Sequence, residues 1–214
     1  MGSSTETAIF VQPAKVLMRM QINTDLVGVT DVLISALVGA QLHIQSLLDS
    51  KFEVQDYSAD FFLDSDAFSA IQPNGLYRVE LPTGFVREDS DFTLIYDTDW
   101  RFSTAQVIPS TDYKLDAIRG RVLVDPQYGD YYLRAAFTAG YTPGDPADLE
   151  STPPESIPDW LEEAIISYVG IVLDVSQTTN RAGNAMLQYK RAGDHALSII
   201  APYLRNRGFS FRHI

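Results

Sequence analysis

The sequence predicts an α+β protein in which a four-helix bundle forms the core and a β-rich module is inserted between the second and third helices. The hydrophobic period of the 214-residue chain changes twice, from helix-like to strand-like and back to helix-like. The helices at both ends each carry one apolar stripe, which a single helix cannot bury alone. We therefore expect a helical bundle from 1–51 and 142–206, a small sandwich- or barrel-like module from 52–141, and a C-terminal tail at 207–214.

The first helical region contains two predicted helices. The stretch 13–22 opens with a proline, which suits a first helical turn. The stretch 30–52 is the stronger prediction, with Thr30 or Asp31 as the N-cap because either side chain can accept from a free backbone N–H group. Its apolar residues follow the spacing of one helical face: Leu33, Leu37, Ala40, Ile44 and Leu47. His43 lies beside this stripe and is interpreted as a packed or surface histidine.

The middle region is predicted to form a sheet with one buried side. Its short runs are rich in Val, Tyr, Phe and Thr and are separated by turn-forming residues. The predicted strands are 76–81, 92–96, 113–116, 120–125 and 131–141. In the last of these, apolar residues occupy alternate positions from Leu133 to Ala139, which is the pattern of a half-buried strand.

The helical period returns after a proline-rich loop at 142–158, which we interpret as the return path from the sheet to the bundle. A helix is predicted over 157–176, and the acids Asp159, Glu162 and Glu163 in its first turn complement the helix dipole. Its predicted apolar stripe is Leu161, Ile165, Tyr168, Val172 and Val175. A last helix is predicted over 185–206, before Gly208.

The composition is that of a globular protein, with 45% hydrophobic and 21% charged residues. The chain has no cysteine, which excludes disulfides and thiolate metal sites. We expect neither a signal peptide nor a membrane span. The net charge is −12, yet the stretch from Arg181 onward holds six basic residues and one acid. The body of the chain is therefore strongly acidic, which argues against general affinity for DNA.

Sequence signals of catalysis are weak, so we expect a protein that is not an enzyme and has no cofactor. The chain lacks the G-x-S-x-G and H-E-x-x-H motifs and a glycine-rich phosphate loop. Two acidic clusters could bind a hard cation and support a metal-dependent hydrolase, although solvated loop acids are the simpler interpretation. The clusters are Asp56, Asp60, Asp64 and Asp66, and Glu88, Asp89, Asp91, Asp97 and Asp99.

The aromatic residues of the middle region suggest a second alternative, a carbohydrate- or receptor-binding module with an aromatic groove. A role as core residues and cross-strand pairs is the simpler interpretation for them. The residues are Tyr77, Phe85, Phe92, Tyr96, Trp100 and Phe102.

Several segments, in this order, resemble the head–tail connector (adaptor or head-completion) proteins of tailed double-stranded-DNA bacteriophages. The opening helix pair is similar in "QPAKVLMRMQINTD" and "DVLISALVGAQLHIQSLLDSKF". The middle of the family is similar in "YKLDAIRGRVLVD", "AAFTAGYTPGD" and "IPDWLEEAIISYVGIVLD", and its end in "ALSIIAPYLRNRGF". The chain departs from the family pattern in the extra length of 52–112.

The resemblance implies a structural virion protein at the head–tail junction, assembled in the host cytoplasm. Copies would form a ring, commonly a dodecamer, that binds the portal protein, extends the DNA channel and presents a surface to a tail or tail-completion protein. Double-stranded DNA would pass through without sequence-specific binding, and no membrane is involved. We expect the basic aromatic end of the chain to bind the portal or a neighbouring subunit. These residues are Arg205, Arg207, Phe209, Phe211 and Arg212.

Overall fold

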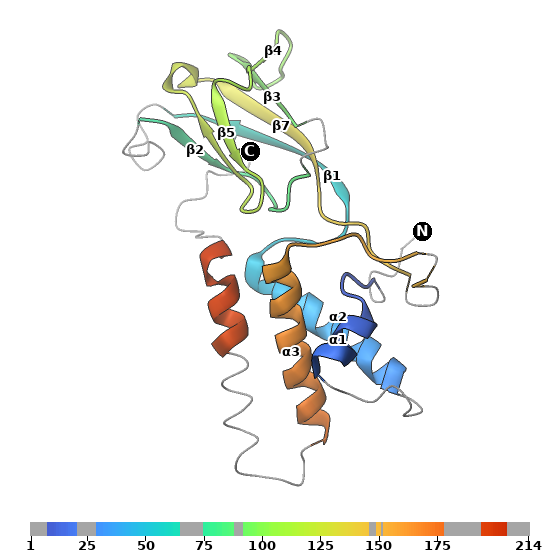
Figure 1. Cartoon of the computed structure of the whole chain (residues 1–214). Helices are drawn as coiled ribbons and strands as arrows, with labels where there is room; N and C mark the ends of the chain where they lie inside the picture. The colour runs from blue at the N-terminus through green and yellow to red at the C-terminus, as the bar shows by residue number, and fades with distance from the viewer. Residues whose placement is uncertain are drawn as a thin grey trace. The chain divides into compact units, whose positions relative to one another are not determined.

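The computed structural model of the chain divides into two compact units (Figure 1). The structure describes residues 8–20, 29–64, 75–87, 92–145, 149–150, 152–177 and 194–204. The described part of 1–48 and 141–204 forms the helical unit, and that of 49–140 forms the β unit. The predicted domain bounds, with 52–141 as an inserted β module, stay a prediction.

The helical unit is built on a pair of long helices. The α-helices are α1 Pro13–Met20, α2 Val29–Leu48 and α3 Asp159–Gln177. The most extensive helix contact joins α2 to α3, and the short α1 touches both. The buried core of the pair is made of Leu33, Leu37, Ala40, Ile44 and Leu48 of α2, with Leu161, Ala164, Ile165, Val169 and Leu173 of α3.

The predicted stripe of α2 is confirmed at four of its five positions. Leu48 is buried in place of Leu47, because the spacing from Ile44 is four residues and not three. The N-cap prediction is wrong, since α2 already begins at Val29 and both Thr30 and Asp31 lie within its first turn. His43 is exposed and stacks on Tyr168 of α3 with ring centroids 4.3 Å apart, which agrees with the prediction of a packed or surface histidine.

One segment of α2, Asp31–Leu48, is long and apolar enough to cross a membrane by length and composition alone. Core helices of globular proteins have the same length and composition. Leu33 and Leu37 are almost fully buried inside the helical unit, which is the environment of a core helix.

The prediction of a four-helix bundle core is wrong. The first helix has only eight residues, too few to run along the long pair. At the C-terminal end the described helix covers 194–200 and gives way to a 3-10 turn at Ala201–Tyr203, with Pro202 inside that turn. The structure instead combines this helical unit with two antiparallel sheets, so the protein has mixed α and β content.

The chain before α1 is held by one buried amide side chain. Gln41 of α2 is 2% exposed; its Oε1 accepts from the backbone N–H of Phe10 at 2.8 Å. Its Nε2 donates to the carbonyl of Ala8 at 3.0 Å. On the same stretch, the carbonyl of Ile9 accepts from the N–H of Gly144 at 2.7 Å. The beginning of the return loop is therefore tied to the beginning of the chain.

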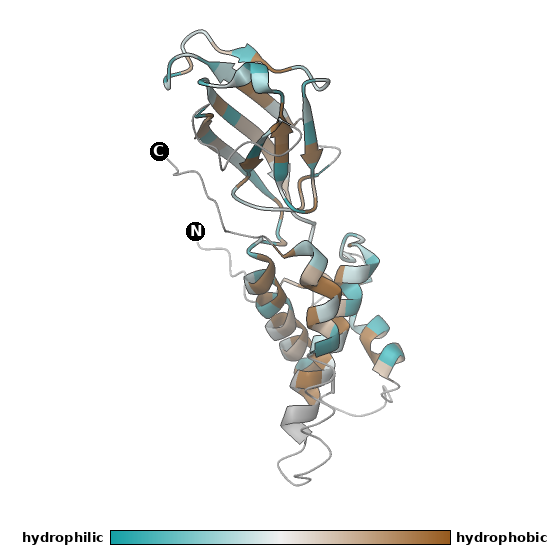
Figure 2. Cartoon of the chain, turned by 90° about the vertical axis from the view of Figure 1, so that its left-hand side faces the viewer, coloured by the Kyte–Doolittle hydropathy of each residue, from teal (hydrophilic) through white to brown (hydrophobic). Residues whose placement is uncertain are grey.

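The β unit consists of two antiparallel sheets that share one core. The strands are β1 Gln55–Phe62, β2 Tyr77–Glu80, β3 Thr93–Asp97, β4 Gln106–Val107, β5 Tyr113–Asp116, β6 Arg121–Val124 and β7 Tyr132–Ala139. One sheet has the order β1-β7-β3-β4 and the other the order β2-β6-β5. The core cluster takes residues from both sheets, including Phe61, Leu94 and Leu133 from the first and Val79 and Val122 from the second. The alternation of apolar and polar residues along the strands can be followed in Figure 2.

The sequence prediction found five of these strands and missed two. β4 has only two residues. β1 was missed because its sequence QDYSADFF contains two aspartates. Aspartate is uncommon in strands, so the stretch was interpreted as an acidic loop. In the structure β1 pairs along its full length with β7, so the acids Asp56 and Asp60 lie on a strand.

The residues at which the chain enters and leaves the β unit lie next to each other. Gly140, at the end of β7, has a φ of +101°, a conformation that other residues rarely adopt. A Cβ atom at this position would lie 2.4 Å from the carbonyl oxygen of Glu53 and 2.8 Å from that of Phe52. The entry and exit of the β unit are therefore in backbone contact, and only glycine permits so close an approach.

Candidate partner-binding surface

The predicted partner-binding residues of the C-terminal end lie outside the described residues. They are Arg205, Arg207, Phe209, Phe211 and Arg212. Their role stays a prediction.

Two described acids of the first predicted cluster, Asp56 and Asp60, bond to residues of the neighbouring strand β7. Asp60 receives two hydrogen bonds from the opposite residue Arg134, Nε to Oδ1 at 2.7 Å and Nη2 to Oδ2 at 2.8 Å. These bonds raise the pKa of Arg134, whose guanidinium also lies 4.2 Å from the ring centre of Phe102. Asp56 accepts from the hydroxyl of Thr138 at 2.7 Å. Asp66 lies outside the described residues, and Asp64 is exposed.

The second predicted acidic cluster also includes residues outside the described part of the chain. Glu88, Asp89 and Asp91 lie outside the described residues. Asp97 is 4% exposed and closes the loop after β3: its Oδ2 accepts from the N–H of Thr104 at 2.7 Å and its Oδ1 from the N–H of Asp99 at 3.1 Å. Burial raises the pKa of Asp97, but these hydrogen bonds outweigh it and leave the pKa below the ordinary value. Among the described residues, no three His, Asp or Glu side chains are grouped as metal ligands.

The aromatic residues proposed as a binding groove do not lie on one surface. Tyr77 and Phe85 are buried, and Phe85 packs edge-on against Phe52. Phe92 and Tyr96 pack against the core, whereas Trp100 is 58% exposed. Most of this set therefore stabilises the interior, and the geometry does not favour a carbohydrate groove.

A charged surface that the sequence analysis did not single out lies on the outward face of the sheet β2-β6-β5. The inward positions of these strands include the core residues Val79 and Val122. The strand register places the alternate residues in two rows across the outward face. One row is Arg78, Leu123 and Lys114; the other is Glu80, Arg121 and Asp116. We call these six residues the charged face.

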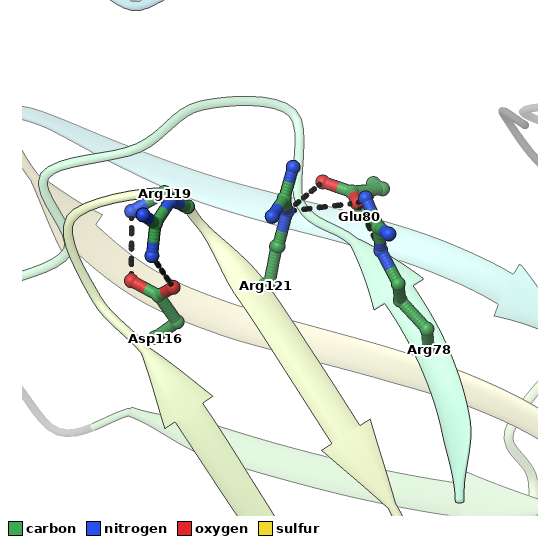
Figure 3. Close-up of polar contacts among 5 residues, drawn as sticks. All are labelled: Arg78, Glu80, Asp116, Arg119 and Arg121. Atoms are coloured by element: carbon green, nitrogen blue, oxygen red, sulfur yellow. Dashed lines mark hydrogen bonds and ion pairs between the residues drawn. The ribbon is translucent and has the colours of Figure 1, made fainter. Parts of the chain in front are cut away.

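Ion pairs organise the charged face (Figure 3). Glu80 accepts from two guanidinium groups, Nε of Arg78 at 2.6 Å and Nε of Arg121 at 3.0 Å. The Glu80 and Arg121 side chains are only 18% and 19% exposed. Asp116 accepts from Nη1 of Arg119 at 2.9 Å and from the backbone N–H of the same residue at 3.1 Å. The carboxylates thus fix the directions in which the guanidinium groups point.

The charged face contains a pocket of about 280 Å³, lined by Arg78, Lys114, Leu115, Asp116, Arg121 and Leu123. The exposed Lys114 forms no ion pair with any described carboxylate. Leu123 provides an apolar residue between the cations Arg78 and Lys114 in its row. Arg78 and Lys114 lie on either side of Leu123, so an anionic group can bind between these two cations.

The sequence contains part of the signal for this surface. The alternation in 77–80 and 121–124 puts Arg78, Glu80 and Arg121 opposite the buried valines. The order of the strands in the sheet, which brings β2 and β5 to opposite sides of β6, cannot be inferred from that alternation. Without the strand order, the charges could not be assigned to one surface.

No protein-family model matches the chain, and a search of curated proteins finds no match. Among solved structures, the chain is similar to one in the neck of an empty gene transfer agent particle computed with C6 symmetry, with a TM-score of 0.42 and 12% identity over 90% of this chain and 92% of that one. It is also similar to a chain in the virion of a native gene transfer agent particle, with a TM-score of 0.40 and 14% identity over 89% and 92%. For a chain in the neck of a native particle computed with C12 symmetry, the TM-score is 0.38 and the identity 15%, over 90% and 92%. Scores at this level do not establish a shared fold, so the function proposed below rests on the residues of this chain.

Proposed function

We propose that the protein is a structural virion component, a head-to-tail adaptor that forms a ring below the portal, extends the DNA channel and offers an attachment surface to the tail. The observation that carries the proposal is the order of the segments that resemble the connector family. A short helix and a long helix precede the β region. The stretch ending in Ala139-Gly140-Tyr141 leads through an acidic loop to a helix that begins at Asp159, directly after Pro158.

The fold is compatible with this order. The helices that the resemblance matches at the two ends of the chain, α2 and α3, pack on each other in one unit. The additional length lies in the β unit, between them. A chain organised in this way presents two different kinds of surface, which a ring with head-to-tail contacts between subunits requires.

The charge of the chain also supports a DNA conduit. The net charge is −12, and the basic residues are enriched after Arg181. An acidic lumen repels phosphate groups, so a DNA duplex can slide through without being retained. The basic end of the chain is then available for the portal, as proposed for Arg205, Arg207 and Arg212.

Electron microscopy of the purified protein, alone and mixed with the portal protein of the same particle, tests this function. We expect closed rings, twelve-fold when bound to the portal. A protein that stays monomeric alone and does not bind the portal would overturn the proposal.

Deletion of 207–214 tests the portal contact separately. We expect portal binding to be lost while the circular dichroism spectrum and the melting temperature stay unchanged. The matched control is Ser210→Ala, which retains the arginines and phenylalanines of the tail and should bind like the parent. Unchanged binding by the deletion variant would remove the tail from the portal contact.

A further inference from the structure

The charged face carries more positive than negative charge, although the chain as a whole is strongly acidic. Together with Arg119, which is paired to Asp116, it holds four cationic side chains and two carboxylates. The chain has 16 basic and 28 acidic residues. The excess of cations on this face is therefore unusual for the chain, and we expect it to attract an anionic partner.

The arrangement of charges favours a protein partner over DNA. Glu80 and Asp116 lie in the same row as Arg121 and would repel a phosphate backbone. Rows of alternating sign are typical of protein–protein contacts, where they fix the register of the partners. The apolar Leu123 between Arg78 and Lys114 is also suited to the aliphatic part of a short acidic side chain.

The chain itself contains a segment with the complementary charge. From residue 135 to residue 180 there is no lysine or arginine. The loop 142–158 lies inside this stretch, and Asp145 and Glu150 are exposed on it. Glu150 has no ion-pair partner among the described residues.

The described parts of this loop are ordered by backbone hydrogen bonds. The N–H of Asp145 donates to the carbonyl of Thr152 at 3.1 Å, and the N–H of Glu155 to the carbonyl of Thr142 at 2.9 Å. The N–H of Thr142 donates back to a carboxylate oxygen of Glu155 at 2.8 Å. A loop with such internal bonds loses little conformational entropy when it binds.

We propose that the charged face of one copy binds the described part of the acidic loop of a second copy, at 142–145, 149–150 and 152–158, with the carboxylate of Glu150 placed between Arg78 and Lys114. This inference rests on the proposed function, because it assigns the contact between neighbouring subunits of the ring. The two surfaces differ, so the contact is heterologous and repeats around a closed ring.

The absence of cysteine from the chain allows a direct test by cross-linking. The full-length variants K114C and E150C are mixed, alone and on the portal, and treated with a short bismaleimide. Only a contact between two copies can join them. We expect at least a fivefold higher yield of cross-linked dimer than for the control mixture of V107C and E150C, since Val107 is 65% exposed but lies on the other sheet.

Charge reversal tests the attraction itself. K114E and E150K should each weaken self-association about tenfold in sedimentation experiments at low salt, because like charges then face each other. An equimolar mixture of K114E and E150K should recover part of the loss. K114R retains the charge and is the matched control.

The outcomes separate this inference from the proposed function. Rings without a cross-link above the control would overturn the inference and leave the adaptor function standing. Cross-linked dimers without rings would overturn the function and support the contact.

A cross-link within a single dilute chain carrying both cysteines would show that the loop binds its own copy. Binding of duplex DNA that is lost in K114E would show that the face takes phosphate. Either of these two results would overturn the inference.

Discussion

The two units of the protein are stabilised by different kinds of contact. In the β unit, backbone ladders join the strands, and polar side chains are bonded inside the unit, as with Asp97 and the loop that it closes. In the helical unit, side chains make the contacts between helices. Lys15 and Arg19 of α1 pair with Glu162 and Glu163 at the start of α3, at 2.7 and 3.4 Å.

The C-terminal segment of the helical unit contributes two buried residues, Ala196 and Ile200, and one aromatic contact. Trp160 of α3 stacks on Tyr203 with ring centroids 3.8 Å apart. Contacts of this kind involve exposed or half-buried groups, which contribute less free energy than a closed core. We therefore expect the stability of the β unit to be insensitive to changes in the helical unit. The stability of the helical unit should depend on how well separate segments of the chain pack on α3.

The chain offers one tryptophan in each unit, Trp100 and Trp160, so their unfolding can be followed separately. The variant W160F leaves a fluorescent probe in the β unit, and W100F leaves one in the helical unit. We expect two distinct unfolding midpoints, because the described residues form two compact units. A single shared midpoint in both variants would contradict this expectation.

The largest effect is expected from Leu133→Ala near the start of β7. Leu133 is fully buried and lies between Phe61 of β1 and Tyr96 of β3. Truncation leaves a cavity and should lower the free energy of unfolding of the β unit by about 2–5 kcal/mol. Urea unfolding in the W160F background measures the loss, and the W100F background should show the helical unit unchanged.

The control for this prediction is Val107→Ala. Val107 is 65% exposed, so its truncation should change the free energy by no more than about 0.5 kcal/mol. An equal loss in both units upon Leu133→Ala would mean that they unfold together.

An intermediate effect is expected from acid. The pKa of Asp97 is lowered in the folded protein, so its carboxylate stabilises the β unit at neutral pH. This contribution is present above the unfolded pKa and is lost as the pH falls below about 4 towards the folded pKa. The melting temperature of the β unit should therefore fall less steeply between pH 5 and pH 3 in Asp97→Asn than in the parent.

Glu150→Gln is the matched control for the acid experiment, because the exposed Glu150 belongs to the helical unit. Its β unit should show the same pH dependence as the parent. If Asp97→Asn followed the parent curve, the hydrogen bonds from Thr104 would not hold the carboxylate charged. Asp112, whose pKa is lowered by its bond from the Tyr128 hydroxyl, would then be the next group to replace.

The smallest effect is expected from Lys15→Met in α1. The side chain of Lys15 is 50% exposed and that of Glu162 is 23% exposed. Exposed ion pairs contribute about 0.2–1 kcal/mol, so the helical unit should lose no more than that. Denaturation in the W100F background measures the change, and Lys15→Arg should restore the parent value. A loss above about 2 kcal/mol would show that α1 is tied to α3 more strongly than its exposure suggests.

The same difference between the units explains what the sequence could predict. Strand positions such as 113–116 followed from alternation and from the turns beside them, which are local signals. Helix positions also followed from local periodicity, and α3 begins within two residues of the predicted start. How helices assemble is set by side-chain contacts between distant segments, and so the four-helix bundle was wrong.

The charged face illustrates the same limit for a site. Arg78, Glu80 and Arg121 are visible in the sequence, and their alternation with valines places them outward. The pairing of β2 with β6 joins residues that lie 41 positions apart, as in the contact of Arg121 with Glu80. A pattern among neighbouring residues carries no information about contacts at this separation in sequence. The pocket between the strands therefore could not be predicted.

The backbone contact of Gly140 with Phe52 and Glu53 has a consequence for the history of such chains. A segment whose first and last residues meet can be gained, exchanged or lost as one cassette, since a short peptide suffices to close the gap left behind. A chain that lacks this segment, or that carries an unrelated domain at the same point, would therefore need no other change in its helices.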